Sequence, residues 1–355
     1  YPKTTMNAET QKIVATSVKV GQKFSWIDRL TIWIDHLPLP AWLFYLVLMV
    51  VGEFLFNLIF WIDGSVPFWQ RVSLQSASPS LVILSVALYH YLTRVGSQSL
   101  QDFRPLLEVD EAEIAQIDFS LNYLPSWMNW ILLILTVPGS VWYVFSSPNT
   151  FGEIVPQTIL PACVVLVLSV IVVMAVYSQF FRIIRQVRIL QDLYQRASNI
   201  NLLYLEPAHA FARLTASTGG GLILLMVVGI LYNPELATGV TLAGVILAVF
   251  FSILIFIVPL MGMRRRLISE KNQYLKKIGD LLQVTTDKIH SMVGNQNESD
   301  ISAAKSTMSA LIEERALIEK VSTWPWNPGT IRGFASTLLL PIVLWLITRL
   351  LERYF

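Results

Sequence analysis

The sequence predicts an all-α polytopic membrane protein, a bundle of about seven transmembrane helices with a cytoplasmic helical hairpin. Three observations predict this fold class: the composition, the length of the apolar runs and the placement of the positive charges. Of the 355 residues, 54% are hydrophobic and 14% are charged, and the mean hydropathy is +0.56. A soluble domain carries about 25% charged residues, and charges are rare inside a bilayer because their transfer into hydrocarbon is costly.

Apolar runs long enough to cross a bilayer recur along the chain. A spanning helix needs roughly 20 predominantly apolar residues and satisfies its own backbone hydrogen bonds. The predicted spans are Ala41–Ile62, Pro79–Thr93, Trp127–Phe145, Val155–Phe181, Ala216–Tyr232, Leu236–Met263 and Ile331–Leu351.

The positive charges predict the orientation of these spans. With a cytoplasmic N-terminus, 23 of the 26 Lys and Arg residues fall in cytoplasmic segments. Cytoplasmic loops of membrane proteins carry an excess of Lys and Arg. We therefore expect the N-terminus inside, the C-terminus outside and an odd number of spans in the plasma membrane.

The cytoplasmic segments are themselves predicted to be helical. In Ser25–Leu37, the apolar side chains fall within an arc of about 120° at 100° per residue, which predicts an amphipathic helix on the membrane surface. That arc comprises Trp26, Ile27, Leu30, Trp33, Ile34 and Leu37. The predicted parts of the chain are 1–40 with the interfacial helix, 41–263 with six spans, 264–329 with the hairpin and 330–355 with the last span.

The hairpin is predicted from apolar residues at coiled-coil-like spacing on two arms. The first arm carries Tyr274, Ile278, Leu281, Thr285 and Met292, and the second carries Ile301, Ala304, Met308, Leu311, Arg315 and Ile318. A turn at 294–297 separates them, and 324–329 breaks the helix before the last span.

Glu53 is a candidate functional residue because it lies deep inside the first predicted span, with Asn57 one turn further along. An ionisable residue inside a span marks a transport site, or it forms a hydrogen bond to a neighbouring helix. We expect Glu53 to be protonated or paired. His90 lies closer to the inner boundary, and we interpret it as extending to the cytoplasmic surface.

Two further sets of polar residues are candidates. Glu206, His209 and Arg213 are spaced to share one helix face before the fifth span, either as a ligand set or as a polar cluster that clamps the cytoplasmic end of the bundle. In the last span, a polar stripe forms a candidate pore lining or an interhelical contact. It comprises Thr337, Leu344, Thr348 and Glu352, together with Pro341.

Motifs of soluble enzymes are not found in the sequence. Gly219–Gly221 is not followed by the Lys-Ser/Thr of a phosphate-binding loop, and we expect these glycines to allow close helix approach. The single cysteine, Cys163, cannot form a disulfide or a cysteine cluster within these residues. We expect no catalytic residue, metal, cofactor or nucleic acid, and a lipid bilayer and further copies of the chain as partners.

The order of these elements resembles that of insect odorant and gustatory receptors. The shared features are seven spans, short outer loops, and a long sixth helix leading into a cytoplasmic arm before the final span. The family's Thr-Tyr…Gln-Phe signature is absent from the last span, so the resemblance is one of topology over the whole chain. It implies a tetrameric cation channel in which the last span lines the pore. Glu206–Arg213 and Trp324–Gly329 also look like segments of uncharacterised prokaryotic membrane proteins.

Three functions follow as alternatives. The first is a homo-oligomeric ion channel or ligand-gated, receptor-like channel subunit with the last span at its axis. The second is a secondary transporter that uses Glu53, with a central cavity near that residue. The third is a membrane scaffold or sensor built around the hairpin, with a closed bundle.

Overall fold

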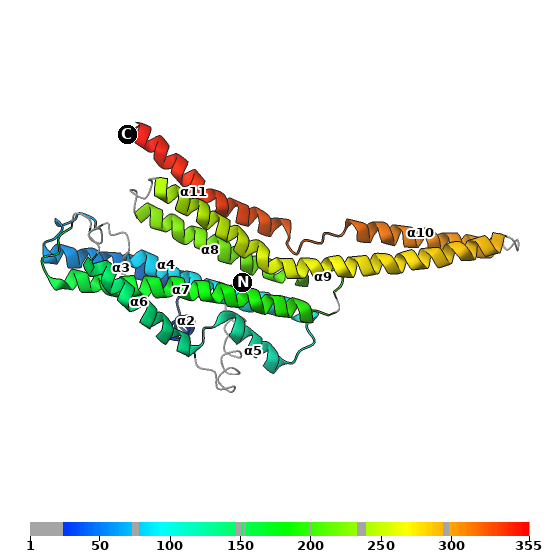
Figure 1. The fold of residues 1–355 in the computed structure, drawn as a ribbon, viewed down its shortest axis with the longest axis horizontal. Helices are drawn as coiled ribbons and strands as arrows, with labels where there is room; N and C mark the ends of the chain where they lie inside the picture. The colour runs from blue at the N-terminus through cyan, green and yellow to red at the C-terminus, as the bar shows by residue number, and fades with distance from the viewer. Residues whose placement is uncertain are drawn as a thin grey trace.

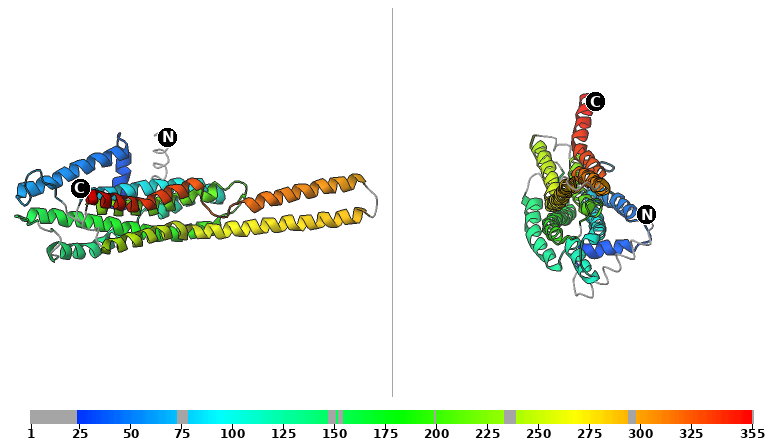
Figure 2. Two further views of the ribbon diagram at one scale, coloured as in Figure 1. Left: turned by 90° about the horizontal axis from the view of Figure 1, so that it is seen from above. Right: turned by 90° about the vertical axis from the view of Figure 1, so that its right-hand side faces the viewer.

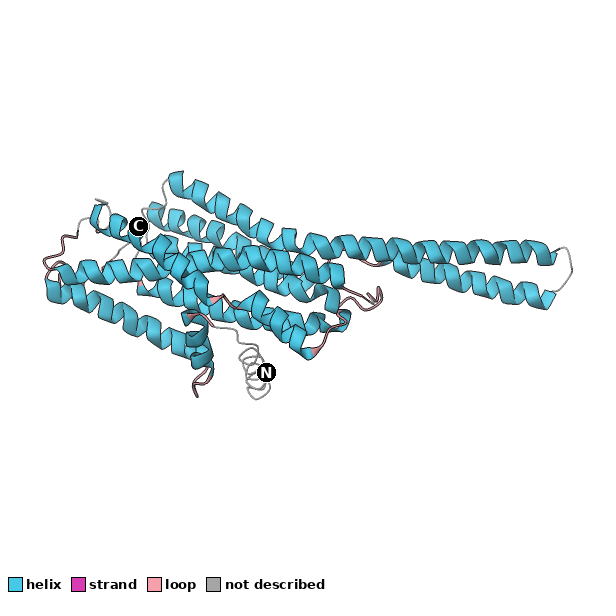
Figure 3. Cartoon of the chain, turned by 60° about the horizontal axis from the view of Figure 1, so that its bottom comes forward, coloured by secondary structure: helices cyan, strands magenta, loops and turns pink. Residues whose placement is uncertain are grey.

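A computed structural model describes residues 24–72, 78–146, 151, 154–198, 200–232, 239–293 and 298–354. Its helices are α2 Trp26–Asp35, α3 Ala41–Asp63, α4 Pro79–Phe103, η1 Arg104–Leu106, α5 Glu111–Asn122, α6 Ser126–Ser146, α7 Ile159–Arg196, η2 Pro207–His209, α8 Ala210–Tyr232, α9 Gly239–Val293, α10 Glu298–Lys320 and α11 Pro328–Tyr354. Helices make up nearly all the regular structure of the described ranges (Figure 3). The predicted all-α class is confirmed.

The molecule has two regions, a helix bundle and a long projection (Figure 1). The first part of α9 packs in the bundle, and its remainder runs beside α10 in the projection. Because α9 is one helix of 55 residues, it extends roughly 80 Å at 1.5 Å per residue. The hairpin is thus a direct extension of a bundle helix.

Five helices in the described part of the chain are long and apolar enough to cross a membrane: α3, α6, α7, α8 with η2, and α9. In four of them only 22–28% of the apolar window is buried by the rest of the chain, against 56% for α8. Their outward side chains are therefore apolar, as a lipid environment requires. The chain is a multi-pass membrane protein.

Helix α4 is buried on nearly all sides. It packs against α3, α5, α7 and α8, and it extends ten residues beyond the predicted end at Thr93. Since other helices cover it, α4 can carry Ser, Thr and His without exposing them to hydrocarbon. This accounts for a hydropathy lower than that of the lipid-facing helices.

Helix α2 packs against the bundle on one side. Ile27 and Ile34 are each 2% exposed, but Trp26 and Trp33 remain 40% and 53% exposed. The buried side also includes Asp28 and Thr31. The buried side overlaps the predicted apolar arc at Ile27, Leu30 and Ile34 and is rotated away from Trp26 and Trp33, because hydrogen bonds turn Asp28 toward the bundle.

The hairpin seam is the set of residues through which the two arms pack against each other. It follows the prediction on α10 and is shifted on α9. On α10, Ala304 and Ile318 are buried, while Arg315 is exposed and pairs with Glu319. On α9 the seam comprises Lys271, Leu275, Ile278, Leu282, Thr285 and Ile289. Tyr274 and Leu281, predicted in the seam, are 41% and 53% exposed.

Candidate functional site

A buried polar network, which we call the α2 clamp, fastens α2 to the bundle. Ser25 caps α2, and its backbone N–H donates to Asp28 Oδ2 at 3.1 Å. Asp28 also accepts from the Tyr89 hydroxyl of α4 at 2.6 Å and from the Leu124 N–H at 3.3 Å. Burial raises the pKa of Asp28, against the opposing effect of these hydrogen bonds. One carboxyl group therefore joins three separate segments of the chain.

Arg182 of α7 contacts both the ring and the backbone of Tyr89. Its guanidinium is 4.4 Å from the Tyr89 ring centroid, and Nη1 donates to the Tyr89 carbonyl at 3.2 Å and to Thr93 Oγ1 at 3.0 Å. Arg182 is only 2% exposed. Because a buried charge is costly without a partner, the negative charge of Asp28 at the Tyr89 hydroxyl helps to stabilise the Arg182 guanidinium over the Tyr89 ring.

The C-terminal end of α2 is held by a second set of contacts. Asp35 Oδ1 lies 3.1 Å from His90 Nε2 and also pairs with Arg94. His90 Nδ1 lies 3.0 Å from the Tyr45 hydroxyl of α3. Burial opposes ionisation of Asp35, but the hydrogen bond and charge of His90, with those of Arg94, lower its pKa overall. His90 is 3% exposed, so its predicted extension to the cytoplasmic surface was wrong.

Glu53 and Asn57 hold the opposite end of the bundle. Glu53 Oε1 accepts from Ser78 Oγ at 2.8 Å, from Ser80 Oγ at 2.6 Å and from the Ser80 N–H at 3.1 Å. It thereby satisfies donors at the start of α4, where a carboxylate is favourable. Asn57 donates to the Glu53 carbonyl at 2.8 Å and accepts from the Val72 N–H at 2.9 Å. Both side chains thus fix the connection between α3 and α4.

Of the predicted set Glu206, His209 and Arg213, the first two lie close enough to interact electrostatically. Glu206 and Arg213 are exposed, and Glu206 accepts from the Tyr204 hydroxyl at 3.2 Å. His209 is half-buried and hydrogen-bonds to the backbone of Trp324. No group of three metal-ligating side chains is found within the described ranges.

The predicted stripe of α11 is only partly described. Thr337 lies against α8, where a Cβ on Gly220 would be 3.2 Å from Thr337 Cγ2. Pro341 is buried, whereas Leu339, Ile342, Val343 and Ile347 face outward. The side chains of Leu344, Thr348 and Glu352 lie outside the described residues. In its described part, the stripe therefore faces the chain's own bundle.

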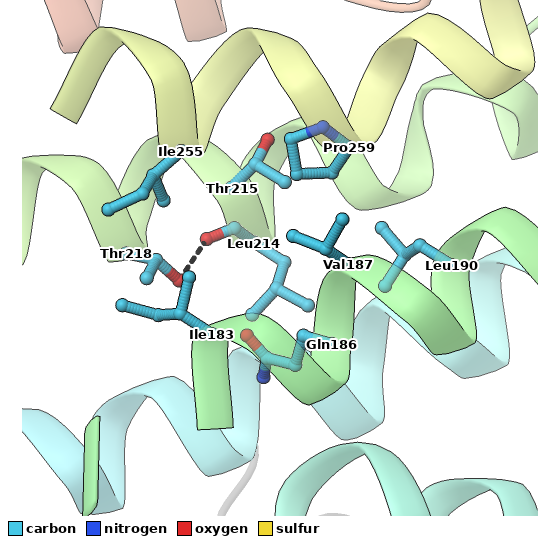
Figure 4. Close-up of a pocket in the computed structure, with 9 residues that line it drawn as sticks. All are labelled: Ile183, Gln186, Val187, Leu190, Leu214, Thr215, Thr218, Ile255 and Pro259. Atoms are coloured by element: carbon cyan, nitrogen blue, oxygen red, sulfur yellow. Dashed lines mark hydrogen bonds between the residues drawn. The ribbon is translucent and has the colours of Figure 1, made fainter. Parts of the chain in front are cut away.

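The bundle contains a small cavity between α7, α8 and α9 (Figure 4). Its volume is about 10 Å³, which suits roughly one water molecule. Thr218 points into this region and donates to the Leu214 carbonyl at 2.8 Å. The cavity is too small for a substrate.

The hairpin presents exposed apolar side chains on one side, interspersed with Lys277 and Lys288, and we call this side the apolar flank. Tyr274 defines this side because its hydroxyl donates to Glu314 Oε1 across the hairpin at 3.1 Å. Exposed apolar residues follow at helical spacing on both arms. The flank comprises Tyr274, Leu281 and Val284 of α9 with Ala303, Ala310 and Leu317 of α10.

Sequence reasoning missed the α2 clamp and the apolar flank. The only signal for the clamp was the presence of Asp28 and Asp35 beside an apolar arc, since their partners lie 61 and 55 positions away along the chain. Comparison with family models, with curated proteins and with solved structures finds no match, so the candidate sites stand on their geometry.

Proposed function

We propose that this protein is a non-enzymatic membrane scaffold that assembles through the apolar flank of its hairpin. One observation carries the proposal: three large apolar side chains on a projecting hairpin are 53–64% exposed on the same side, namely Leu281, Val284 and Leu317. In water such a surface favours burial against a partner, at roughly 25 cal/mol per Å² of apolar area.

The hairpin is held rigidly to the bundle, which suits a scaffold. Helix α9 continues without a break from one region into the other. Lys271 Nζ donates to the carbonyls of Glu319 and Val321 at 2.8 and 2.9 Å, and the Arg264 guanidinium lies 3.8 Å from a ring centroid of Trp324. These contacts fix both arms where the hairpin leaves the bundle.

A second copy of the chain is the partner that fits. Two copies inserted in the same direction carry parallel hairpins, so a twofold axis along the membrane normal can bring the two flanks together. Lys277 and Lys288 border the flank on α9, and Glu314 borders it on α10. Such a pairing places the basic edge of one copy near the acidic edge of the other.

The geometry of the other candidate residues supports the scaffold over the transporter. A transporter that uses Glu53 requires this carboxylate to be free for a substrate or proton. Its Oε1 atom instead accepts three hydrogen bonds from Ser78 and Ser80.

A homo-oligomeric channel is the second candidate, favoured by the position of α11 at the edge of the bundle (Figure 2). An edge helix can face the axis of an oligomer. We expect a channel of this kind to show cation currents in planar bilayers that change in selectivity with Glu352→Lys. A reconstituted oligomer that conducts no current would exclude the channel, and the scaffold would be the remaining proposal.

We also propose that α4 and α11 cross with the five apolar helices, giving about seven spans and a cytoplasmic hairpin in the plasma membrane. In a Cys163→Ser background, an impermeant thiol reagent applied outside cells should label Phe68→Cys and not Ser120→Cys. Labelling of Ser120→Cys would reverse the orientation.

The scaffold proposal is tested by the mass of the protein in nanodiscs. We expect the wild-type chain to be an oligomer and the double variant Leu281→Glu with Leu317→Glu to be a monomer. The matched control is Ile312→Glu, since Ile312 is 50% exposed on the opposite side of the hairpin. A monomeric wild type, or equal disruption by the control, would refute assembly through the flank.

A further inference from the structure

An open groove of about 850 Å³ lies between α4, α8 and α11. Helices α8 and α11 both begin at the hairpin end of the bundle, so residues early in each helix share one end of the groove. Arg213, Asn327 and Thr330 line that end, and Leu88, Leu224 and Leu340 line the other. The groove is therefore polar at one end and apolar at the other.

Glycines shape this groove. A Cβ on Gly221 would lie 2.5 Å from Leu88 Cδ1, and a Cβ on Gly219 would lie 2.9 Å from the Ser252 carbonyl. These two positions bring α8 close to its neighbours, as predicted for the triple glycine. Gly333 of α11 differs, because a Cβ there would meet no atom within 4 Å. It faces the open space of the groove.

Arg213 supplies the charge at the polar end. Within the described ranges, no carboxylate forms a salt bridge with its exposed guanidinium. The rings of Trp324 and Trp326 stack at 4.3 Å in the connection that precedes α11, and Trp326 stacks on Phe256 of α9 at 5.3 Å. Tryptophan is enriched at the boundary between lipid and water, so this end of the groove lies near the membrane surface.

The length of the groove matches one leaflet. Arg213 and Leu224 lie on the same helix and line its two ends. Eleven residues of α-helix rise roughly 16 Å, and half of a typical hydrocarbon core is about 15 Å. A lipid molecule with its phosphate beside Arg213 would therefore reach Leu224 with an acyl chain.

We propose that this groove is a binding site for a phospholipid with an anionic headgroup. The phosphate pairs with Arg213, and the side chains of Asn327, Thr330 and Ser217 surround the polar end. One acyl chain lies along Leu88, Leu224 and Leu340. The charge of Arg213, the apolar far end and the position among membrane helices all match this occupant. The site is independent of the assembly proposed for the hairpin.

The test uses the full-length protein in nanodiscs of equal parts phosphatidylglycerol and phosphatidylcholine. Native mass spectrometry measures which lipid stays bound after release. We expect the wild type to retain phosphatidylglycerol preferentially and Arg213→Gln to show about a fivefold weaker preference, because one Arg near the surface contributes about 1 kcal/mol. Arg332→Gln is the matched control, since Arg332 is exposed at the same end of α11 and does not line the groove.

A second pair of variants tests the groove without changing charge. Gly333→Leu places a side chain in the groove and should reduce retention of either lipid. Gly229→Leu is its control, because a Cβ at Gly229 also meets no atom within 4 Å but the residue lies outside the groove. Equal retention by Arg213→Gln and wild type, or equal losses in Arg213→Gln and Arg332→Gln, would overturn the proposal. Displacement of the bound lipid by inorganic phosphate would also overturn it, since that marks a site for free anions.

Discussion

The bundle and the hairpin both expose large apolar side chains, but the exposure has a different meaning in each region. Trp42 of α3 is 67% exposed, and Val284 of the hairpin is 64% exposed. Lipid is the solvent of the bundle, so Trp42 needs no protein partner. Charged side chains are exposed over the hairpin, so we propose that water surrounds it and that a partner covers the surface around Val284.

The two regions also differ in where they place charged side chains, since the bundle buries some of them and the hairpin exposes them. The bundle buries Asp28 and Arg182 at 0% and 2% exposure. The hairpin keeps its charges at the surface, as in the pair Arg315 and Glu319, which are 51% and 52% exposed. An exposed pair of this kind is worth about 0.3–0.5 kcal/mol, whereas loss of one partner of a buried pair costs about 3–5 kcal/mol. Single charges should therefore matter in the bundle and not in the hairpin.

The largest change in stability is expected when one carboxylate is removed in each region and the two losses are compared. Asp28→Ala leaves the Tyr89 hydroxyl and the Leu124 N–H without their acceptor and removes a negative charge that acts on Arg182. We expect a destabilisation of roughly 3–5 kcal/mol. Asp280→Ala, at an exposed hairpin position, should change stability by less than about 0.5 kcal/mol. Equilibrium unfolding in mixed micelles, followed by circular dichroism, measures both. Similar losses in the two variants would remove the distinction.

A smaller effect is expected from the pH response of the bundle. Asp118 of α5 is 1% exposed, and burial raises its pKa from 3.8 to about 6. The folded protein therefore binds this proton more tightly than the unfolded chain does. Its contribution to stability is fully present below pH 3.8, is lost as the pH rises through about 6, and amounts to at most about 3 kcal/mol.

The variant Asp118→Asn should remove this contribution and flatten the fall in unfolding free energy between pH 4 and about 6. Its control is Asp287→Asn on the exposed side of the hairpin, which should keep the wild-type slope. The same unfolding measurement, repeated across pH, distinguishes the two. An unchanged slope in Asp118→Asn would place the responsible group elsewhere in the bundle.

The sequence predicted features that depend on local pattern and missed those that depend on distant partners. The α10 side of the hairpin seam follows from a regular apolar spacing, and the close approach at Gly219–Gly221 follows from the absence of side chains. The orientation of α2 could not be predicted, because it depends on Tyr89, 61 positions away from Asp28. The α9 seam was displaced because Tyr274 and Leu281 continue the apolar spacing while lying on the flank.

The smallest expected effects come from one substitution made in both regions. At Gly96 of α4, an added Cβ would lie 1.9 Å from Asn122 Oδ1 and 2.9 Å from its Cγ. Asn122 is fully buried and donates to Ser97 Oγ at 3.1 Å and to Asp118 Oδ1 at 2.9 Å. It cannot move aside without losing these bonds, so Gly96→Ala should displace α5 and cost about 1–3 kcal/mol.

At Gly279, on the polar side of the hairpin, an added Cβ would meet no atom within 4 Å. Alanine is favoured over glycine inside a helix, so Gly279→Ala should stabilise the hairpin by roughly 0.5–1 kcal/mol. The two variants should thus shift the unfolding free energy in opposite directions, and Gly333→Ala, which is also open, should behave like Gly279→Ala. A loss of stability in Gly279→Ala would mean that a partner covers the polar side of the hairpin. That result would contradict assembly through the apolar flank. A gain of stability in Gly96→Ala would mean that α5 does not pack on α4 as described.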